Sequence, residues 1–203
     1  MKIKICGLTT PKEAAYLNQY HVDFAGFVLF FPKSKRNITI EQAKEIFKGL
    51  DASIKKVAVV VSPTLEQAKE IETAGFDYIQ IHGILSEELL TGLQIPILKA
   101  FNLSDMEQYD FYAKQPSIAG FVFDAPEPGS GKPFDWTLLH QLPKCNKLVL
   151  LAGGLHPENV AAAIETVSPD GVDVSSGVEF DQESGKDPDK IKAFVENARK
   201  AQP

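Results

Sequence analysis

The stretch Lys2-Ile3-Lys4-Ile5-Cys6-Gly7-Leu8-Thr9-Thr10-Pro11-Lys12-Glu13 contains a complete change from strand to helix. Lys2–Cys6 is short and rich in isoleucine, which predicts a strand, and Gly7 follows it as a turn residue. Thr10 then suits a helix N-cap, Pro11 the first helical position and Glu13 the third position after the cap. This combination predicts that a helix begins shortly after the first strand.

The same alternation continues along the whole chain. Strands are predicted over Lys2–Cys6, Phe24–Leu29, Lys56–Val60, Tyr78–Ile81, Ile97–Phe101, Ile118–Phe123, Lys147–Leu151 and Gly171–Val174. Helices are predicted over Pro11–Tyr20, Ile40–Gly49, Leu65–Ala74, Glu87–Gly92, Asp105–Ala113, Asp135–Gln141, Glu158–Val167 and Pro188–Lys200. Each unit spans about 25 residues, which is enough for one strand, one helix and two short loops.

Alternating strands and helices indicate an α/β protein with a parallel sheet and helical crossovers. Eight units favour closure into a single-domain (β/α)8 TIM barrel of minimal length that spans residues 1–203. The alternative is an open doubly wound sheet, but no G-x-G-x-x-G follows the first strand. The Pro- and Gly-rich segment Ala125–Lys132 is too short to link two domains, so we expect an active-site loop there.

The composition excludes several classes of partner. The chain has 21 basic and 27 acidic residues, a formal net charge of −6, and no strongly basic block, which argues against nucleic acid and anionic membranes. No apolar run approaches the ~18 residues of a membrane span. The first strand begins at once, so we expect no signal peptide, a cytoplasmic location and reduced thiols on the two cysteines.

Several predicted strands end in polar residues that share the inward parity of a barrel wall: Cys6, His82, Asp124 and Asp173 with Ser175. Active sites of such barrels lie at the carboxyl ends of the strands. The positive ends of the helix dipoles point to the same face, so we expect it to attract anions and to favour the thiolate of Cys6. Lys4 also has inward parity, and because first and last strands are neighbours in a closed barrel it could pair with Asp173.

Two glycine-containing loops follow the last two strands. Gly153 and Gly154 follow the seventh strand, and Ser175, Ser176 and Gly177 follow the eighth. Glycines let a backbone approach an anion and serines add hydroxyl donors. These loops are either tight turns or a phosphate site; their position after consecutive late strands favours the phosphate site.

The chemistry-bearing candidates each have a plainer interpretation. A cysteine such as Cys6 is often a small buried apolar residue, and Asp124 could be an ordinary loop residue. Facing one cavity, however, they would make a base and an acid. Arg36 suits a carboxylate or phosphate, or is a solvated loop residue. His82 is a substrate contact or a satisfied strand-end histidine.

Other residues carry no such prediction. Cys145 precedes the seventh strand, at the opposite end of the barrel, and we interpret it as non-functional. No H-x-H, H-E-x-x-H or C-x-x-C motif is present, so no metal site is predicted.

A set of motifs in the expected order resembles the phosphoribosylanthranilate isomerase family. The motifs are Lys4-Ile5-Cys6-Gly7-Leu8-Thr9, Gly26-Phe27-Val28 with Pro32-Lys33-Ser34-Lys35-Arg36, Gln80-Ile81-His82-Gly83, Asp124 with Gly129-Ser130-Gly131 and Phe134-Asp135-Trp136, Gly153-Gly154-Leu155 with Pro157-Glu158-Asn159-Val160, and Asp173-Val174-Ser175-Ser176-Gly177-Val178-Glu179. They cover nearly the whole chain, and although no single motif is decisive, the set is highly specific.

The resemblance implies the third step of tryptophan synthesis from chorismate, an Amadori rearrangement of N-(5-phosphoribosyl)anthranilate to 1-(2-carboxyphenylamino)-1-deoxyribulose 5-phosphate. It implies Cys6 as the general base, Asp124 as the general acid, Arg36 as the contact of the anthranilate carboxylate, and the Gly-Gly and Ser-Ser-Gly loops as the phosphate site. It implies no cofactor, a small sugar-phosphate substrate, and either a monomer or a homodimer.

One residue departs from the family pattern. Pro128 stands where the loop after Asp124 usually has a glycine, which could stiffen that loop without touching acid or base. The rivals are the related histidine-pathway isomerase, which uses two aspartates, indole-glycerol-phosphate synthase, which relies on Lys and Glu, and a non-catalytic sugar-phosphate sensor. Cys6 argues against the first, the absence of a strand-ending Glu against the second, and the pairing of Cys6 with Asp124 against the third.

Overall fold

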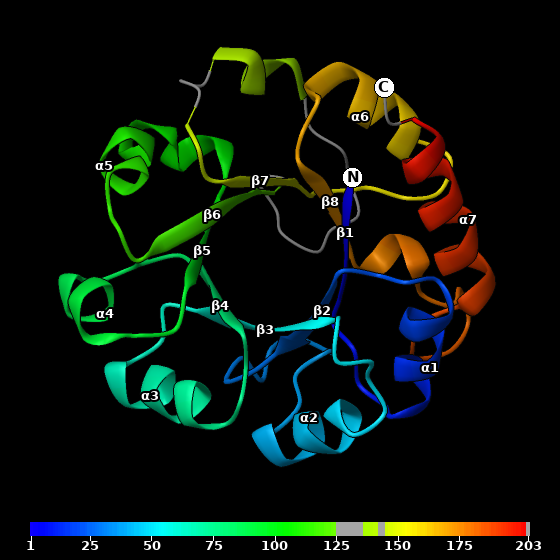
Figure 1. The fold of residues 1–203 in the computed structure, drawn as a ribbon, viewed down its shortest axis with the longest axis horizontal. Helices are drawn as coiled ribbons and strands as arrows, with labels where there is room; N and C mark the ends of the chain where they lie inside the picture. Colours follow the sequence, from blue (N-terminus) through cyan, green and yellow to red (C-terminus); the bar gives the residue numbers. More distant parts are fainter. Residues whose placement is uncertain (125–135, 142–144, 202–203) are drawn as a thin grey trace.

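The computed structural model describes residues 1–124, 136–141 and 145–201 of the chain. Within these residues eight parallel strands pair in sequence order, and β8 closes on β1 to form a barrel (Figure 1). The helices form an outer ring around the strands, as the alternating sequence pattern predicts. The closed barrel is therefore confirmed, and the open doubly wound alternative was wrong.

The strands are β1 Lys2–Cys6, β2 Phe24–Val28, β3 Lys55–Val61, β4 Tyr78–His82, β5 Ile97–Phe101, β6 Ile118–Phe123, β7 Leu148–Leu151 and β8 Gly171–Val174. The α-helices are α1 Lys12–Gln19, α2 Ile40–Phe47, α3 Leu65–Thr73, α4 Glu87–Gly92, α5 Tyr109–Ala113, α6 Val160–Val167 and α7 Pro188–Lys200. The described ranges also contain three short 3-10 helices, η1 Leu103–Gln108, η2 Trp136–Gln141 and η3 Ser176–Val178. Among the described residues no helix is long and apolar enough to cross a membrane.

Two crossovers differ from the predicted α-helices. The connection after β5 divides into the 3-10 helix η1 and the five-residue helix α5, and the described part of the connection after β6 is the 3-10 helix η2. The predicted loop Ala125–Lys132, with Pro128, lies outside the described residues.

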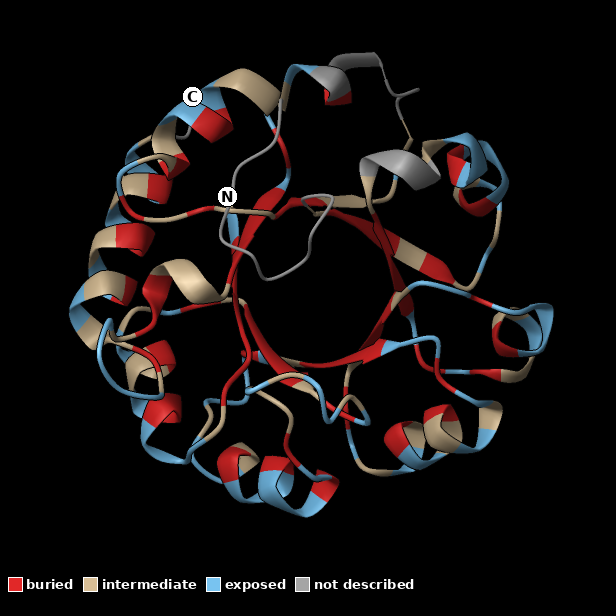
Figure 2. Cartoon of the chain, turned by 180° about the vertical axis from the view of Figure 1, so that it is seen from behind, coloured by how far each residue is buried: buried red, intermediate tan, exposed pale blue. Residues whose placement is uncertain are grey.

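The strands of the barrel wall are mostly buried (Figure 2), and their side chains alternate between two apolar layers. Ile3, Ile5, Phe121 and Phe123 point outward and are buried against the helices. The barrel interior is a separate apolar cluster that consists of Cys6, Phe24, Val57, Val59, Leu98, Ala100, Val122, Leu150 and Ala152. The inward parity predicted for Cys6 is thus confirmed. The apolar cluster fills the barrel interior, and the polar residues lie at the carboxyl ends of the strands.

Helix caps fix where several crossovers begin. Thr39 and Gln42 form a complete capping box at α2, with both reciprocal hydrogen bonds present. At α1 only half of the predicted box forms: Glu13 Oε2 accepts hydrogen bonds from the backbone N–H groups of Thr9 and Thr10, while Pro11 occupies the cap position. Glu13 is 2% exposed, so its carboxylate ties the loop after β1 into the interior.

Candidate active site

A cavity of about 160 Å³ lies at the carboxyl ends of the strands. The predicted site residues that line it are Cys6, Arg36, His82, Asp124, Gly153, Gly154, Ser175 and Ser176. The remaining lining residues are Val28, Phe31, Ser34, Val59, Val61, Gln80, Ala152, Leu155, Asp173 and Val174. Residues from both ends of the chain therefore meet in one polar space, as the strand parity predicts.

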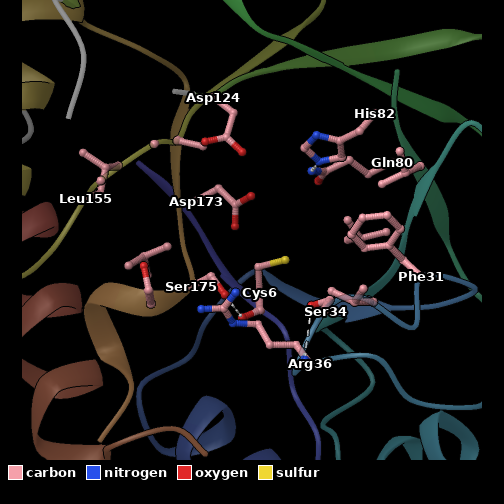
Figure 3. Close-up of a pocket in the computed structure, with 18 residues that line it drawn as sticks. Cys6, Phe31, Ser34, Arg36, Gln80, His82, Asp124, Leu155, Asp173 and Ser175 are labelled. Atoms are coloured by element: carbon pink, nitrogen blue, oxygen red, sulfur yellow. Dashed lines mark hydrogen bonds between the residues drawn. The ribbon is translucent and has the colours of Figure 1, made fainter. Parts of the chain in front are cut away.

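Cys6 is the last residue of β1, and its side chain enters the cavity from the barrel wall (Figure 3). The neighbouring strand makes room for the thiol with a glycine, because a Cβ on Gly26 would lie 2.9 Å from Cys6 Sγ. Cys6 is 8% exposed. Its carbonyl oxygen accepts a hydrogen bond from the Ser175 hydroxyl at 2.9 Å, which joins the end of β1 to the loop after β8.

The pair between Lys4 and Asp173 is confirmed directly below the thiol. Lys4 Nζ lies 2.7 Å from Asp173 Oδ2, and the Lys4 side chain is fully buried. Burial alone would lower the pKa of Lys4, but Asp173 and Cys6 together outweigh burial and raise it. Lys4 therefore remains a cation within reach of Cys6.

The expectation that this face favours the thiolate was wrong for the unliganded protein. Burial raises the pKa of the Cys6 thiol above its ordinary value, because it removes water from the charged form. Lys4 and Lys186 act in the opposite direction, and Asp173 adds to the effect of burial. The free protein thus holds Cys6 as a thiol at neutral pH, with two cations nearby to stabilise the thiolate once it forms.

Asp124 directly follows β6 and lies across the cavity from Cys6. Its backbone N–H donates to the carbonyl of Phe101 at 2.9 Å, so the strand ladder continues one residue beyond β6 and fixes its position. Figure 3 shows the carboxyl of Asp124 and the thiol of Cys6 turned toward the same open space. An acid and a base on opposite walls can act on two atoms of one small molecule.

A carboxylate that the sequence reasoning did not single out holds Arg36. The Nε and one terminal nitrogen of Arg36 donate to the two carboxylate oxygens of Glu179, at 2.5 and 3.2 Å, in a two-point contact. Ser34 Oγ accepts from the backbone N–H of Arg36, which fixes the loop after β2. Burial would raise the pKa of Glu179, but Arg36, Lys186 and Lys35 outweigh it and hold the pKa at about 2. Arg36 is therefore an oriented cation rather than a solvated loop residue.

His82 ends β4 and pairs with Gln80, which has the same inward parity. Gln80 Nε2 and His82 Nε2 lie 2.9 Å apart. Burial, Lys4 and Lys99 lower the pKa of His82 to about 3, so the ring is neutral at physiological pH. Gln80 lines the cavity, and among the described residues its buried Oε1 atom has no hydrogen-bond partner, so it is available to a ligand donor.

The two late loops form an anion-receptive corner. Gly153 and Gly154 have φ values of 81° and 67°, a left-handed backbone that exposes consecutive N–H groups. Ser175 and Ser176 face them from the end of β8 and the start of η3. Gly177, predicted to bind substrate, does not line the cavity. It lets the two loops touch, because a Cβ there would lie 2.0 Å from the carbonyl oxygen of Leu155.

The architecture defines the class of protein. A closed (β/α)8 barrel with convergent polar side chains and anion-receptive loops at the carboxyl ends of its strands is the arrangement of a barrel enzyme that acts on a small phosphorylated compound.

Comparison with known proteins identifies the family. The family model of N-(5'phosphoribosyl)anthranilate (PRA) isomerase matches residues 3–197, and the chain belongs to this family. An N-(5'-phosphoribosyl)anthranilate isomerase of Streptococcus mutans is 40% identical over 200 residues, which cover 98% of this chain and 99% of the relative. One from Clostridium kluyveri is 40% identical over 201 residues, with 98% of each chain covered.

Solved structures give the same result. The phosphoribosyl anthranilate isomerase of Thermotoga maritima has a TM-score of 0.86 and 34% identity, with 98% of this chain and 99% of that chain covered. Another phosphoribosyl anthranilate isomerase, solved with reduced 1-(o-carboxyphenylamino)-1-deoxyribulose 5-phosphate, has a TM-score of 0.84 and 32% identity. Monomers made from the dimeric Thermotoga maritima enzyme are also similar, so the related structures include both forms.

Proposed function

We propose that Cys6 and Asp124 carry out the acid–base chemistry of this isomerase, with Arg36 and the two late loops as anchors for its substrate. The activity is the isomerisation of N-(5'-phosphoribosyl)anthranilate in tryptophan biosynthesis. The single observation that carries the assignment of roles is that a thiol from β1 and a carboxyl from the end of β6 line the same cavity.

Asp124 and Cys6 act in successive steps of the reaction. Asp124, protonated, donates its proton to the ring oxygen of the ribose while the bond from that oxygen to C1 breaks, which leaves an iminium cation. Cys6 as thiolate then removes the proton from C2, and the electron pair moves to the nitrogen to give an enolamine. Tautomerisation of the enolamine yields the ketone. The substrate nitrogen accepts the electrons, so the chemistry asks for no cofactor.

The positive charge of the iminium intermediate compensates for the raised pKa of Cys6, because it stabilises the thiolate. A thiolate is costly in this buried position until a positive charge lies beside it. Ring opening creates an iminium next to C2, in the space that Cys6 faces, and Lys4 and Lys186 add to its effect. Cys6 ionises by releasing its thiol proton to water, and the iminium, Lys4 and Lys186 stabilise the resulting thiolate at the stage when the substrate has become acidic at C2.

Two anchors place the reacting carbons between acid and base. Arg36, oriented by Glu179, would take the anthranilate carboxylate at one end. The N–H groups of Gly153 and Gly154 with Ser175 and Ser176 would take the phosphate at the other. His82 and Gln80 also line the cavity, and their neutral ring and amide oxygen suit ribose hydroxyl groups.

Turnover of phosphoribosylanthranilate tests the activity directly, because the fluorescence of the anthranilate group should fall as product forms. Binding without turnover would instead favour a sugar-phosphate sensor. Cys6→Ala and Asp124→Asn should each lower kcat about 100-fold or more, in line with general acid–base contributions. Cys145→Ala, the other cysteine, is the matched control and should retain kcat. A near-wild-type rate in either site variant would remove that residue from the mechanism.

We also propose one domain over residues 1–203, a cytoplasmic location and a monomer or homodimer. The curated relatives match over nearly their full length, which supports the single domain. Sedimentation equilibrium would decide between the two oligomeric states.

A further inference from the structure

Lys186 is a buried lysine next to the active site, and so far only the effect of its charge on Cys6 has entered the mechanism. It lies in the segment between η3 and α7, yet its side chain is only 1% exposed. Burial lowers the pKa of Lys186, because a buried ammonium is costly, and Arg36 adds to this effect, whereas Glu179 and Cys6 oppose it and favour the charged form.

Its contacts reach both ends of the cavity. Lys186 Nζ lies 3.1 Å from the carbonyl oxygen and 3.3 Å from the hydroxyl of Ser175. The same nitrogen lies 3.1 Å from Glu179 Oε1, the oxygen that also accepts from Arg36 Nε. One ammonium group thus joins the loop beside the phosphate corner to the carboxylate that holds Arg36.

The contact with Ser175 continues to Cys6. The Ser175 hydroxyl has one proton, and it donates that proton to the Cys6 carbonyl oxygen, which lies 2.9 Å away. The hydroxyl is then free to accept from Lys186. A chain of hydrogen bonds therefore runs from the buried ammonium through Ser175 to the backbone of Cys6.

The backbone of Lys186 is held as firmly as its side chain. Its N–H donates to Glu13 Oε1 at 2.8 Å. The other Glu13 oxygen accepts from Thr9 and Thr10 in the loop that follows Cys6. The ammonium is therefore fixed relative to β1 from two directions.

We propose that Lys186 is a positioning residue for the isomerisation, which orders Cys6 through Ser175 and Arg36 through Glu179 and places a fixed positive charge beside the thiol. The inference rests on the roles proposed above for Cys6 and Arg36. Lys186 touches neither the reacting carbons nor the carboxylate of the substrate. It acts by holding the groups that do.

The charges around Cys6 agree with this role. Lys4 comes from its own strand, Asp173 from β8 and Lys186 from the segment after η3, and these are the charged groups that act on the thiol in the described structure. Lys4 is already paired with Asp173 at 2.7 Å. Lys4 has the larger effect on the thiol, and Lys186, which shares Glu179 with Arg36 and Lys35, acts in the same direction.

The pH dependence of alkylation tests the proposal without requiring turnover. Wild type and Lys186→Met are treated with iodoacetamide across a pH series, and the modification of Cys6 and of Cys145 is followed separately by peptide mass spectrometry. Loss of the cation should move the midpoint for Cys6 upward by about one pH unit, because less positive charge stabilises the thiolate. The midpoint for Cys145 in the same digest should stay in place.

Steady-state kinetics supply the second readout. Lys186→Met should lower kcat through Cys6 and raise KM through Arg36, each about 10-fold. Lys186→Arg keeps the charge and should keep the wild-type midpoint for Cys6. Lys190→Met is the matched control: Lys190 Nζ binds the backbone carbonyl of Glu179 and the Asp181 carboxylate outside the cavity, and its loss should leave midpoint and kinetics unchanged.

Lys186→Gln retains a donor for Ser175 and Glu179 and serves as the second neutral variant, with the same upward shift expected. An unchanged midpoint for Cys6 in a folded neutral variant overturns the proposal. Failure of both neutral variants to fold also overturns it, because Lys186 would then serve stability. If Cys6→Ala retained turnover, the role of Cys6 would fail, while the alkylation midpoint would still report on Lys186.

Discussion

Lys4 and Asp173 lie side by side in the ladder that closes the barrel, and their side chains form an ion pair inside it. The two residues are register partners of β1 and β8, and Lys4 Nζ lies 2.7 Å from Asp173 Oδ2. Asp173 Oδ1 is buried and has no hydrogen-bond partner in the part of the chain that the structure describes, so this oxygen can still accept a hydrogen bond. The contact therefore joins the two ends of the fold and also borders the active site.

Lys4→Met should destabilise the protein by about 3–5 kcal/mol, because it leaves the buried Asp173 carboxylate without its partner. Chemical denaturation measures this loss. Lys2→Met is the matched control on the same strand, since Lys2 pairs with Asp23 but is 56% exposed, and its loss should cost about 0–1 kcal/mol. An equal decrease in the free energy of unfolding in both variants would show that the contribution of the Lys4–Asp173 pair does not depend on its burial.

The Lys4–Asp173 pair could be predicted from the sequence. Strand parity is a local property with a period of two, so it places Lys4, Cys6 and Asp173 inside the barrel before any coordinates are known. Closure then makes the first and last strands neighbours. The same logic brings Asp124 to the cavity from a strand far along the chain.

Two features of the site could not be predicted from strand parity. Lys186 does not lie at the end of a strand. Its burial depends on how the segment between η3 and α7 packs against β1, and no local pattern in the sequence predicts this packing. Glu179 belongs to a quoted motif, but only the fold shows that it holds Arg36. The prediction of a thiolate was wrong for a related reason. The direction of the helix dipoles can be inferred from the sequence, whereas the burial of Cys6, which raises its pKa, depends on how the whole barrel packs.

Arg36→Met should raise KM about 10-fold or more with a smaller effect on kcat, because a charge-assisted contact with the substrate carboxylate is lost away from the reacting carbons. Steady-state kinetics separate the two constants. Lys35→Met is the control: Lys35 contacts Glu179 at 2.7 Å but is 71% exposed, so KM should change little. An unchanged KM for Arg36→Met would exclude Arg36 from substrate binding.

Gly26→Ala should lower kcat about 10-fold or more by moving the thiol of Cys6. The new Cβ would lie 2.9 Å from Cys6 Sγ and 3.0 Å from its Cα, so the side chain or the strand must shift. Small displacements of a reacting group are costly in rate. Gly92→Ala at the end of α4 is the control, because its Cβ would meet only the movable tip of Leu65 at 3.2 Å. A wild-type kcat for Gly26→Ala would mean that the thiol need not occupy this position.

His82 should make the stability of the fold depend on pH. Its pKa falls from 6.5 to about 3 in the folded protein, since burial, Lys4 and Lys99 disfavour the imidazolium. The unfolded chain therefore takes up a proton near pH 6.5 that the folded chain takes up only near pH 3. The stabilisation is complete above pH 6.5 and is lost as pH falls toward 3, at about 1.4 kcal/mol per pH unit within that window.

His82→Gln should remove this contribution while leaving those of the carboxylates in place. Glu179 is one of them: its pKa of about 2 lies below its ordinary value, so its contribution is present at neutral pH and is lost at the acid end of the range. The difference in unfolding free energy between wild type and variant, measured from pH 7.5 to 4.5, therefore isolates His82. That difference should shrink steadily toward acid pH, by about 2–3 kcal/mol across the range. A constant difference would mean that His82 accepts a proton as readily in the folded barrel as in the unfolded chain, and the neutral imidazole assigned to the substrate cavity would have to be abandoned.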